Sequence, residues 1–345
     1  MSSSWFHAFI VFPHFESTAE HLMLSFAAKL PTLKFCLLIL SITAMGADIQ
    51  QWTIEKPWLE THCLLGEGPF YEKSVDTLRF VDIRNKRLHY VKVTEGPSSL
   101  KTVQLDVCPT VTANIAGVDP QERIALGVKY GLAIFDVKKE TYELIQPFEE
   151  PANERLRSND GGVDPLGRFW LGTMTDFGLG PFKPEGAVYL MDSKSREVKL
   201  PDMTIPNTPG WSPDGKTLYI THSSAREVFA FDFDTESGEI SNKRVFYTHN
   251  GSGEPDGFRV DVDGFIWHAV YGEGRVIRID PKTAEIVGEV KVPTKNTTCV
   301  QFVGTELVIT TAADDEGEGT SREYGGHVFK VDVGIQGLEL HEFKL

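Results

Sequence analysis

A short apolar strand pattern recurs six times along the chain at a nearly constant spacing. The copies, read as the inner strands of a repeat, centre on Phe80, Ala125, Trp170, Tyr219, Trp267 and Val308, which follow one another at intervals of 41–49 residues. Segments that alternate apolar and polar residues follow most copies, as from Val188 to Asp192. This period is typical of propeller blades, small twisted sheets that must pack on their neighbours. We therefore predict an all-β fold, a six-bladed β-propeller over residues 48–345, closed by a strand near Trp52 or Leu338.

A polar residue precedes each predicted inner strand. Counting back four residues from Tyr71, Val118, Val163, Trp211, Val260 and Phe302 gives Glu67, Asn114, Asn159, Asn207, Asp256 and Thr298. The loops that enter the inner strands of a propeller surround one mouth of its channel, so we expect these side chains to converge there. Asn, Asp and Thr also cap ordinary turns, but six of them in register, beside several glycines, favour one shared site.

This ring of residues offers carboxylate, amide and hydroxyl oxygens and contains no His or Cys. Hard divalent cations prefer such ligands, whereas structural zinc is normally held by Cys and His. The sequence therefore predicts a site for one divalent metal ion at a mouth of the channel. Ca²⁺ is favoured, with Mg²⁺, Mn²⁺ or Zn²⁺ as alternatives.

The charge balance limits the class of partner. Asp and Glu number 49 against 34 Lys and Arg, which gives a formal net charge of −15, and no cluster of basic residues occurs. A protein that binds DNA or RNA needs a basic surface to neutralise phosphates. We therefore expect a small-molecule substrate and no nucleic-acid partner; the oligomeric state is left open.

The first 47 residues do not fit the repeat. An apolar run from Phe35 to Ile42 is too short to span a bilayer. It would serve as the core of a signal peptide if translation began at Met23. The alternative, which we favour, is that translation begins at Met45 and the upstream segment is a gene-model extension.

Cysteine usage and sequons bear on the compartment. The four cysteines, Cys36, Cys63, Cys108 and Cys299, show no paired spacing, which favours buried thiols over disulfides. Asn250 and Asn296 begin glycosylation sequons close to the expected site, where a glycan would obstruct access. A cytoplasmic protein is therefore favoured, or a secreted one if the segment from Met23 is a signal peptide.

Several motifs, in this order, resemble the SMP-30/gluconolactonase/LRE family, also called the regucalcin-like family. They cover about residues 50–335 and comprise Leu65-Gly66-Glu67-Gly68-Pro69, Arg157-Ser158-Asn159-Asp160-Gly161, Gly172-Thr173-Met174, Trp211-Ser212-Pro213-Asp214-Gly215 and Pro255-Asp256-Gly257. The resemblance implies a six-bladed propeller, in agreement with the repeat count. It also implies that Glu67, Asn207 and Asp256 bind the metal and that Arg157 and Asn159 bind the substrate.

Family members often hydrolyse lactones, and the expected ring suits that chemistry. A divalent ion would polarise the lactone carbonyl, and Asp256 would act both as ligand and as general base for the attacking water. The predicted function is therefore a divalent-metal-dependent lactonase acting on a sugar-derived or small lactone. The alternatives are a metal-dependent hydrolase of other esters or phosphotriesters, and a non-catalytic calcium-binding or interaction propeller.

Overall fold

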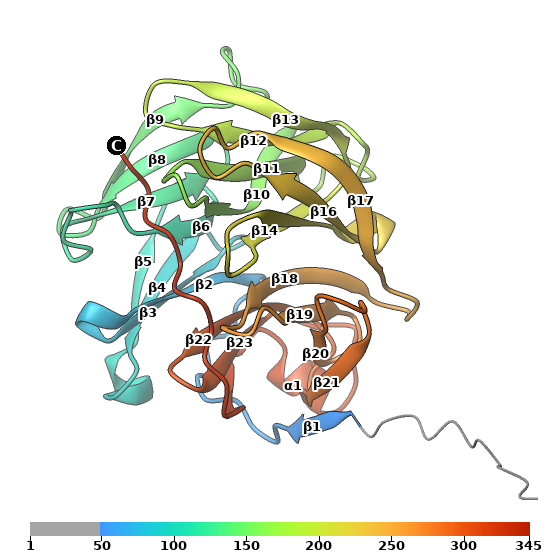
Figure 1. The fold of residues 1–345 in the computed structure, drawn as a ribbon. Coiled ribbons are helices and arrows are strands. Elements are labelled where there is room, and N and C mark those ends of the chain that lie inside the picture. The colour runs from blue at the N-terminus through green and yellow to red at the C-terminus, as the bar shows by residue number, and fades with distance from the viewer. Residues whose placement is uncertain (1–48) are drawn as a thin grey trace, which may run out of the picture. The chain divides into compact units, whose positions relative to one another are not determined.

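Six small β-sheets surround a common axis in the computed structural model, which describes residues 49–345 (Figure 1). The predicted N-terminal segment, residues 1–47, lies outside the described residues. In chain order the sheets are blades 1 to 6, and within each blade consecutive strands pair in antiparallel fashion. The predicted six-bladed propeller is confirmed.

Blades 1 to 3 contain four strands each. Their strands are β2 (Gly66–Glu72), β3 (Thr77–Asp82), β4 (Arg87–Lys92) and β5 (Lys101–Gln104), then β6 (Pro109–Ala113), β7 (Arg123–Val128), β8 (Gly131–Asp136) and β9 (Thr141–Pro147), then β10 (Leu156–Val163), β11 (Phe169–Thr175), β12 (Gly186–Met191) and β13 (Arg196–Met203).

Blades 4 to 6 differ in strand number. Their strands are β14 (Pro206–Trp211), β15 (Thr217–His222), β16 (Glu227–Phe233) and β17 (Ile240–Thr248), then β18 (Glu254–Val260), β19 (Ile266–Tyr271), β20 (Arg275–Ile279) and β21 (Ile286–Lys291), which is joined by β1 (Gln50–Thr53), and finally β22 (Thr297–Val303), β23 (Glu306–Thr311) and β24 (Phe329–Asp332). A short helix, α1 (Thr320–Tyr324), lies between β23 and β24.

The first strand of every blade is the innermost one, because β2, β6, β10, β14, β18 and β22 contact one another in a closed ring. The six residues on which the sequence repeat is centred lie instead on the second strands, β3, β7, β11, β15, β19 and β23. That prediction was wrong for a physical reason. Second strands are buried on both faces and so read as apolar, whereas the innermost strands carry polar residues and glycines.

Two segments that precede blade 1, rather than one, pair with the outer strands of blades 5 and 6. Strand β1 pairs in parallel with β21 of blade 5, and Trp52 packs on Trp267 with ring centroids 5.3 Å apart. The backbone of Leu59 pairs with Val328 beside β24, at the edge of the three-stranded blade 6. Neither expected closing strand was therefore right, because the strand near Trp52 joins blade 5 and Leu338 lies elsewhere.

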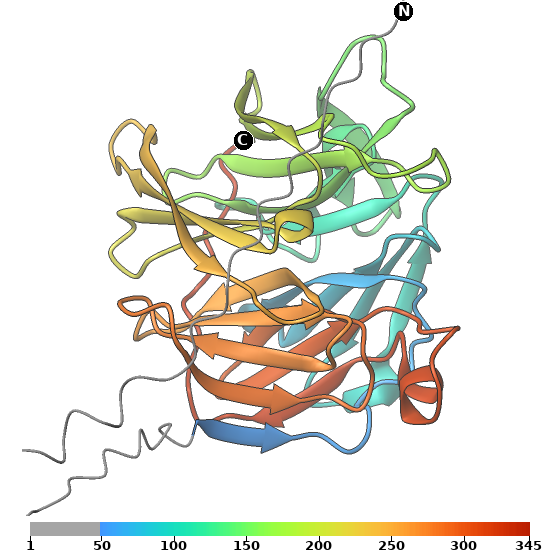
Figure 2. The ribbon, with the colours of Figure 1, turned by 90° about the vertical axis from the view of Figure 1, so that its right-hand side faces the viewer.

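The C-terminal segment, residues 334–345, crosses one mouth of the channel (Figure 1). Leu338 N–H donates to Val260 O at 2.9 Å in blade 5, and Lys344 N–H donates to Gly167 O at 2.8 Å in blade 3. Seen after a 90° turn, this red segment and helix α1 lie on opposite sides of the propeller (Figure 2). The segment thus covers the mouth at which the inner strands end.

Buried aspartates fix the turns that lead from the first to the second strands of blades 3 and 5. Asp164 accepts the Trp170 indole N–H at 3.1 Å, and Asp261 accepts that of Trp267 at 3.0 Å. Both tryptophans are fully buried. Among residues 49–345, no helix has the length and apolar character needed to cross a membrane.

Candidate metal and substrate site

A β-bulge in the innermost strands shapes the mouth opposite the C-terminal segment. In five blades the pairing register slips across two residues near the start of the strand, as between Ser158 and Gly161 in β10 and between Pro255 and Phe258 in β18. The slip points residues out of the ladder and toward the axis. Asn159, Asn207, Asp256 and Thr298 all occupy this bulge position, and Glu67 stands beside the corresponding bulge of β2.

The bulge also explains two glycines in the motifs. A Cβ on Gly68, which has φ +54°, would lie 2.9 Å from Thr110 O, and a Cβ on Gly257 would lie 2.3 Å from Cys299 Sγ. Neither position can hold a larger residue without a shift of its neighbour. These glycines let adjacent blades approach closely beside Glu67 and Asp256.

Three carboxyl groups, two of them buried and one half-buried, influence one another at this mouth. Burial, followed by the charges of Asp256 and Asp160, raises the pKa of Glu67 well above its usual range. Burial and the charge of Asp160 likewise raise the pKa of Asp256. Burial raises the pKa of Asp160 too, while the guanidinium of Arg259 lowers it. Mutual repulsion in a desolvated site is the situation that a divalent cation relieves.

The predicted ligands Asn207 and Asp256 are in direct contact. The side-chain amide of Asn207 donates to Asp256 Oδ1 and, at 3.2 Å, to Ser223 Oγ. Glu67 Oε2 accepts the backbone N–H of Gly68 at 2.9 Å, which directs the carboxylate. The donor set of two carboxylates and an amide, with Asp160 alongside, therefore fits a hard divalent cation by its chemistry.

The predicted substrate-binding residues also lie together. Arg157 donates to Asn159 Oδ1 at 3.0 Å, and Asn159 donates to Pro206 O at 2.9 Å across to blade 4. Arg157 is buried, which lowers the pKa of its guanidinium to about 10, and its Nε has no hydrogen-bond partner in the described part of the chain. The ring of Phe177 stacks on this guanidinium at 4.1 Å, with the exposed Arg84 on the ring as well, at 4.5 Å.

Two members of the predicted ring have other roles. Asn114 follows the end of β6, at the opposite end of that strand, where it donates to Glu72 and accepts from Arg79. Its inclusion was wrong, because the start of the inner strand was placed at Val118, which lies beyond β6. Thr298 occupies the bulge, but its hydroxyl donates to Gly66 O at 2.6 Å and so joins blade 6 to blade 1.

Asp160 is the site residue that sequence reasoning missed. It accepts the N–H of Gly161 at 2.7 Å and the hydroxyl of Thr208, and its side chain is buried. The available signal was its place directly after Asn159, since a two-residue bulge turns both of its residues out of the ladder. A count that selects one residue per blade cannot find it.

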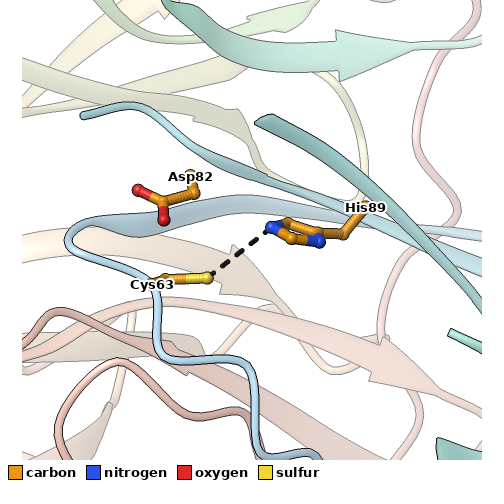
Figure 3. A group of neighbouring side chains, drawn as sticks. All are labelled: Cys63, Asp82 and His89. Carbon is orange, nitrogen blue, oxygen red and sulfur yellow. Dashed lines mark hydrogen bonds between the residues drawn. The ribbon is translucent and has the colours of Figure 1, made fainter. Parts of the chain in front are cut away.

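A second group with metal-ligand atoms lies in blade 1 (Figure 3). The ligand atoms of Cys63, Asp82 and His89 all lie within 4.8 Å of one another, close enough to hold one ion. Each already has a protein partner, however. Cys63 Sγ lies 3.8 Å from His89 Nε2, and both oxygens of Asp82 accept hydrogen bonds from the following turn and from the loop before β2. Burial raises the pKa of the Cys63 thiol to about 12 and lowers that of His89 to about 4, and we read this group as an internal contact of blade 1.

Comparison with known proteins decides the family. The family described as "SMP-30/Gluconolactonase/LRE-like region" matches residues 65–313, which include every residue of the site. The chain belongs to this family. The sequence-based resemblance is thereby confirmed.

Several relatives of this SMP-30/gluconolactonase/LRE-like chain cover most of its length. Regucalcin of Xenopus laevis is 34% identical over 292 residues, or 79% of this chain and 93% of the relative. A protein of Bacillus subtilis, provisionally named a sugar lactone lactonase, is 27% identical over 287 residues, or 81% of this chain and 95% of the relative.

Solved structures of the same family share the fold. A calcium-binding regucalcin from Agrobacterium tumefaciens superposes with a TM-score of 0.78 at 26% identity, covering 86% of this chain and 99% of the other. A luciferin-regenerating enzyme gives a TM-score of 0.74 at 30% identity, covering 82% of this chain and 96% of the other. The family thus includes proteins named for lactone hydrolysis, for calcium binding and for a further enzymatic activity.

Proposed function

We propose that this protein is a divalent-metal-dependent lactonase that hydrolyses a sugar-derived or small lactone. The observation that carries the proposal is a group of three carboxyl groups, the buried Glu67 and Asp160 and the half-buried Asp256, beside the amide of Asn207 at the open mouth of the channel. Their raised pKa values reflect a charge that the protein alone does not balance. The name of the B. subtilis relative supports the substrate class.

Glu67, Asn207 and Asp256 would hold the metal ion, with Ca²⁺ favoured over Mg²⁺, Mn²⁺ and Zn²⁺ for a set of oxygen donors. When bound, the ion would supply Lewis-acid polarisation of the lactone carbonyl. Asp256 is half-buried and faces the mouth from the bulge of β18, so it can accept a proton from an attacking water. Asp256 is accordingly proposed as both ligand and general base.

Arg157 and Asn159 are proposed to orient the substrate. The Nε of Arg157 is buried without a hydrogen-bond partner in the described residues, so a substrate oxygen would complete its bonding. Phe177 holds the guanidinium plane by stacking on it. Asn159, which bonds both Arg157 and blade 4, fixes the distance between this donor group and Asn207.

The test is hydrolysis of gluconolactone and a panel of small lactones by pH-stat. The protein is assayed after chelation and after addition of Ca²⁺, Mg²⁺, Mn²⁺ or Zn²⁺. We expect activity to vanish with chelator and to return with metal. Asp256→Ala should reduce turnover by about 10²–10⁴-fold, the usual contribution of a general base.

Asp263→Asn provides the matched control, because Asp263 is an exposed aspartate in the same blade. Near-normal metal-dependent turnover in Asp256→Ala would contradict the assigned role. Metal binding without turnover of any lactone would favour the calcium-binding alternative, which the description of the A. tumefaciens structure supports. Turnover of esters or phosphotriesters alone would favour the other hydrolase.

A further inference from the structure

Arg84 is an exposed arginine in the turn between β3 and β4. This turn lies at the mouth that holds the carboxyl groups, because Asp82 at the end of β3 pairs with Gly66, next to the proposed ligand Glu67. The proposed mechanism gives Arg84 no role. Its position makes it a contact for the part of a substrate that extends out of the mouth.

The ring of Phe177 lies between Arg84 and Arg157. The guanidinium carbon of Arg84 is 4.5 Å from the ring centroid, and that of Arg157 is 4.1 Å from it. Two guanidinium groups this close to one centroid cannot share a face of the ring, so each covers one face. Arg157 is buried and Arg84 is exposed. Arg84 therefore lies one aromatic ring further out than the arginine that is proposed to orient the substrate.

The N–H donors of Arg84 are unused among residues 49–345, where its side chain forms no hydrogen bond and no ion pair and contacts the ring of Phe177. A guanidinium presents its donors in one plane, an arrangement that suits the oxygens of a carboxylate or a phosphate. Stacking on the ring orients this plane before a ligand arrives. An anion would therefore bind at a lower cost in side-chain ordering than it would at a freely moving arginine.

Two other basic residues in turns at this mouth already have protein partners. Lys129, which follows β7, forms an ion pair with Asp176 at 2.9 Å and so balances the carboxylate next to Phe177. Arg226, which follows β15, donates to the backbone oxygen of Gly251 at 3.0 Å. Arg84 differs from both because its charge is left to interact with a ligand.

The charges of Arg84 and Asp256 act on the same side chain at the rim, the phenol of Tyr271. Burial and the charge of Asp256 raise the pKa of this phenol, whereas the charge of Arg84 lowers it. Asp314 also raises this pKa, so the rim is acidic on that side and basic at Arg84. A substrate with its lactone group near Asp256 would therefore meet Arg84 with its other end.

We propose that Arg84 selects lactones that carry an anionic group, a carboxylate or a phosphate, at the end remote from the lactone carbonyl. This inference rests on the proposed lactonase function and adds a substrate class to it. The preferred substrate would be the lactone of a sugar dicarboxylic acid or of a sugar phosphate. Phe177 would position Arg84 on its outer face for this contact, as it positions Arg157 on its inner face.

The first experiment compares hydrolysis of three lactones by the calcium-loaded protein. Gluconolactone is neutral, glucarolactone carries a carboxylate, and phosphogluconolactone carries a phosphate, so the last two distinguish the possible anions. We expect kcat/KM for at least one anionic lactone to exceed that for gluconolactone by about tenfold or more, the value of a hydrogen bond to a charged group. The gain should lie mainly in KM, because Arg84 is remote from the reacting atoms.

Two variants in the same turn test the residue. Arg84→Gln removes the charge and should abolish the preference for the anionic lactone while leaving the kcat/KM for gluconolactone unchanged. Lys86→Gln is the matched control, because it removes one positive charge from a side chain whose Nζ donates to Asp106 O at 2.9 Å. This control should keep the preference. Thermal unfolding of each variant confirms that the fold is retained.

A binding measurement separates this inference from the proposed lactonase function. Calorimetry compares gluconate, glucarate and phosphogluconate, and Arg84→Gln should weaken binding of glucarate or phosphogluconate by about tenfold without affecting gluconate. This binding pattern without hydrolysis of any lactone would support the anion contact and contradict the lactonase function. Hydrolysis of gluconolactone with no preference for an anionic lactone would overturn the inference about Arg84 alone. A preference, in hydrolysis or in binding, that Arg84→Gln leaves unchanged or that Lys86→Gln removes equally would also overturn it.

Discussion

The side chains at the open mouth carry more negative than positive charge. Glu67, Asp160 and Asp256 lie near one another, and Arg259 is the cation that lowers the pKa of both Glu67 and Asp160. Arg259 donates its hydrogen bonds to Gln301, Pro69 and Phe258 and none to a carboxylate. At the proposed metal site, repulsion among these carboxyl groups destabilises the metal-free protein, and a bound cation would relieve it.

The variant Asp160→Asn tests both the repulsion in the metal-free protein and the contribution of Asp160 to cation binding. The change removes one charge and keeps the shape, and the amide can still accept from Gly161 and donate to Thr208. Because repulsion is relieved, the metal-free protein should unfold at a higher temperature. Because a neighbouring carboxylate is lost, calcium affinity should fall by about 10–100-fold, the usual effect of removing a group that supports the ligands.

Thermal unfolding with and without Ca²⁺ measures both effects in one experiment. Asp106→Asn, which removes an exposed carboxylate, serves as the control and should change neither value. If Asp160→Asn left the calcium-induced increase in unfolding temperature unaltered, Asp160 would not belong to the metal site.

The sequence predicted part of this site because the polar residues follow the repeat. Asn159, Asn207 and Asp256 occupy equivalent bulge positions, so one offset from the strand pattern found all three. Asn114 was misplaced because β6 ends at Ala113 and the apolar pattern continues past it to Ile115 and Val118. Counting along a chain cannot distinguish a strand from the connection that follows it.

Among the structural elements, the turn between β19 and β20 holds the segment that leads to Asp256. Glu273 in this turn accepts the N–H of Gly253 at 2.8 Å and also contacts His249 and Arg275. Burial alone would raise the pKa of Glu273, but these hydrogen bonds and the charge of Arg275 lower it to about 2. The ionised carboxylate thus stabilises the approach to β18.

Glu273→Gln should therefore destabilise the protein in a pH-dependent way. The pKa is about 4.5 when unfolded and about 2 when folded, so the stabilisation is complete above about pH 4.5 and is lost as the pH falls toward 2. At neutral pH we expect a loss of about 1.5–3 kcal/mol, the usual value for hydrogen bonds to a charged group. Chemical denaturation at several pH values measures this loss in the free energy of unfolding.

The difference between Glu273→Gln and the unaltered protein should shrink as the pH falls below about 4.5. Glu285→Gln, an exposed position in the next turn of the same blade, is the control and should show a small effect at every pH. A difference for Glu273→Gln that stays constant over this range would mean that the charge is not its cause.

The sequence predicted the six blades but not the β-bulges in their innermost strands. The strand period gave six blades correctly, because each second strand is apolar on both faces, as in Leu218 to Ile220. A bulge, however, depends on a backbone slip that alternation of apolar and polar residues does not reveal. Pro69 and Gly68 lie within the bulge of β2, and this places Glu67 one residue earlier than the ligands of blades 4 and 5.

At the scale of the whole molecule, residues near both ends of the described chain hold the ring together. Leu59 is fully buried and pairs with Val328, and Phe343 is fully buried against Phe169, with ring centroids 6.1 Å apart. Neither contact was predictable from the repeat, because both segments lie outside the six copies. No disulfide helps to hold the ring closed among the described residues, because Cys63, Cys108 and Cys299 are free.

The absence of disulfides among the described residues agrees with the expectation of free thiols. We propose that translation begins at Met45, because the strand pattern of the sequence begins soon after it, at Gln51, and that the protein is cytoplasmic, because glycans at Asn250 and Asn296 would obstruct the site. N-terminal sequencing of the native protein checks this. A mature end near Asp48, produced by processing of a chain begun at Met23, would contradict the proposal and indicate secretion.

Two shortened chains test how the ring closes. A chain of residues 45–345 keeps β1 and the pairing of Leu59 with Val328, so we expect it to unfold at the same temperature as the full chain and to keep its activity. A chain of residues 62–345 loses both contacts and should unfold at a clearly lower temperature. Leu59→Ala in the 45–345 chain isolates one contact and should cost about 2–5 kcal/mol, as for other buried leucines.

Thermal and denaturant unfolding of the three chains distinguishes closure by Leu59 from closure by β1. If Leu59→Ala accounts for most of the loss seen in the 62–345 chain, the pairing beside β24 is the main closure, and β1 only extends blade 5. If the variant is nearly as stable as its parent while the 62–345 chain is not, β1 and the packing of Trp52 on Trp267 carry the stabilisation. Equal stability of all three chains would show that the inner strands alone hold the propeller closed.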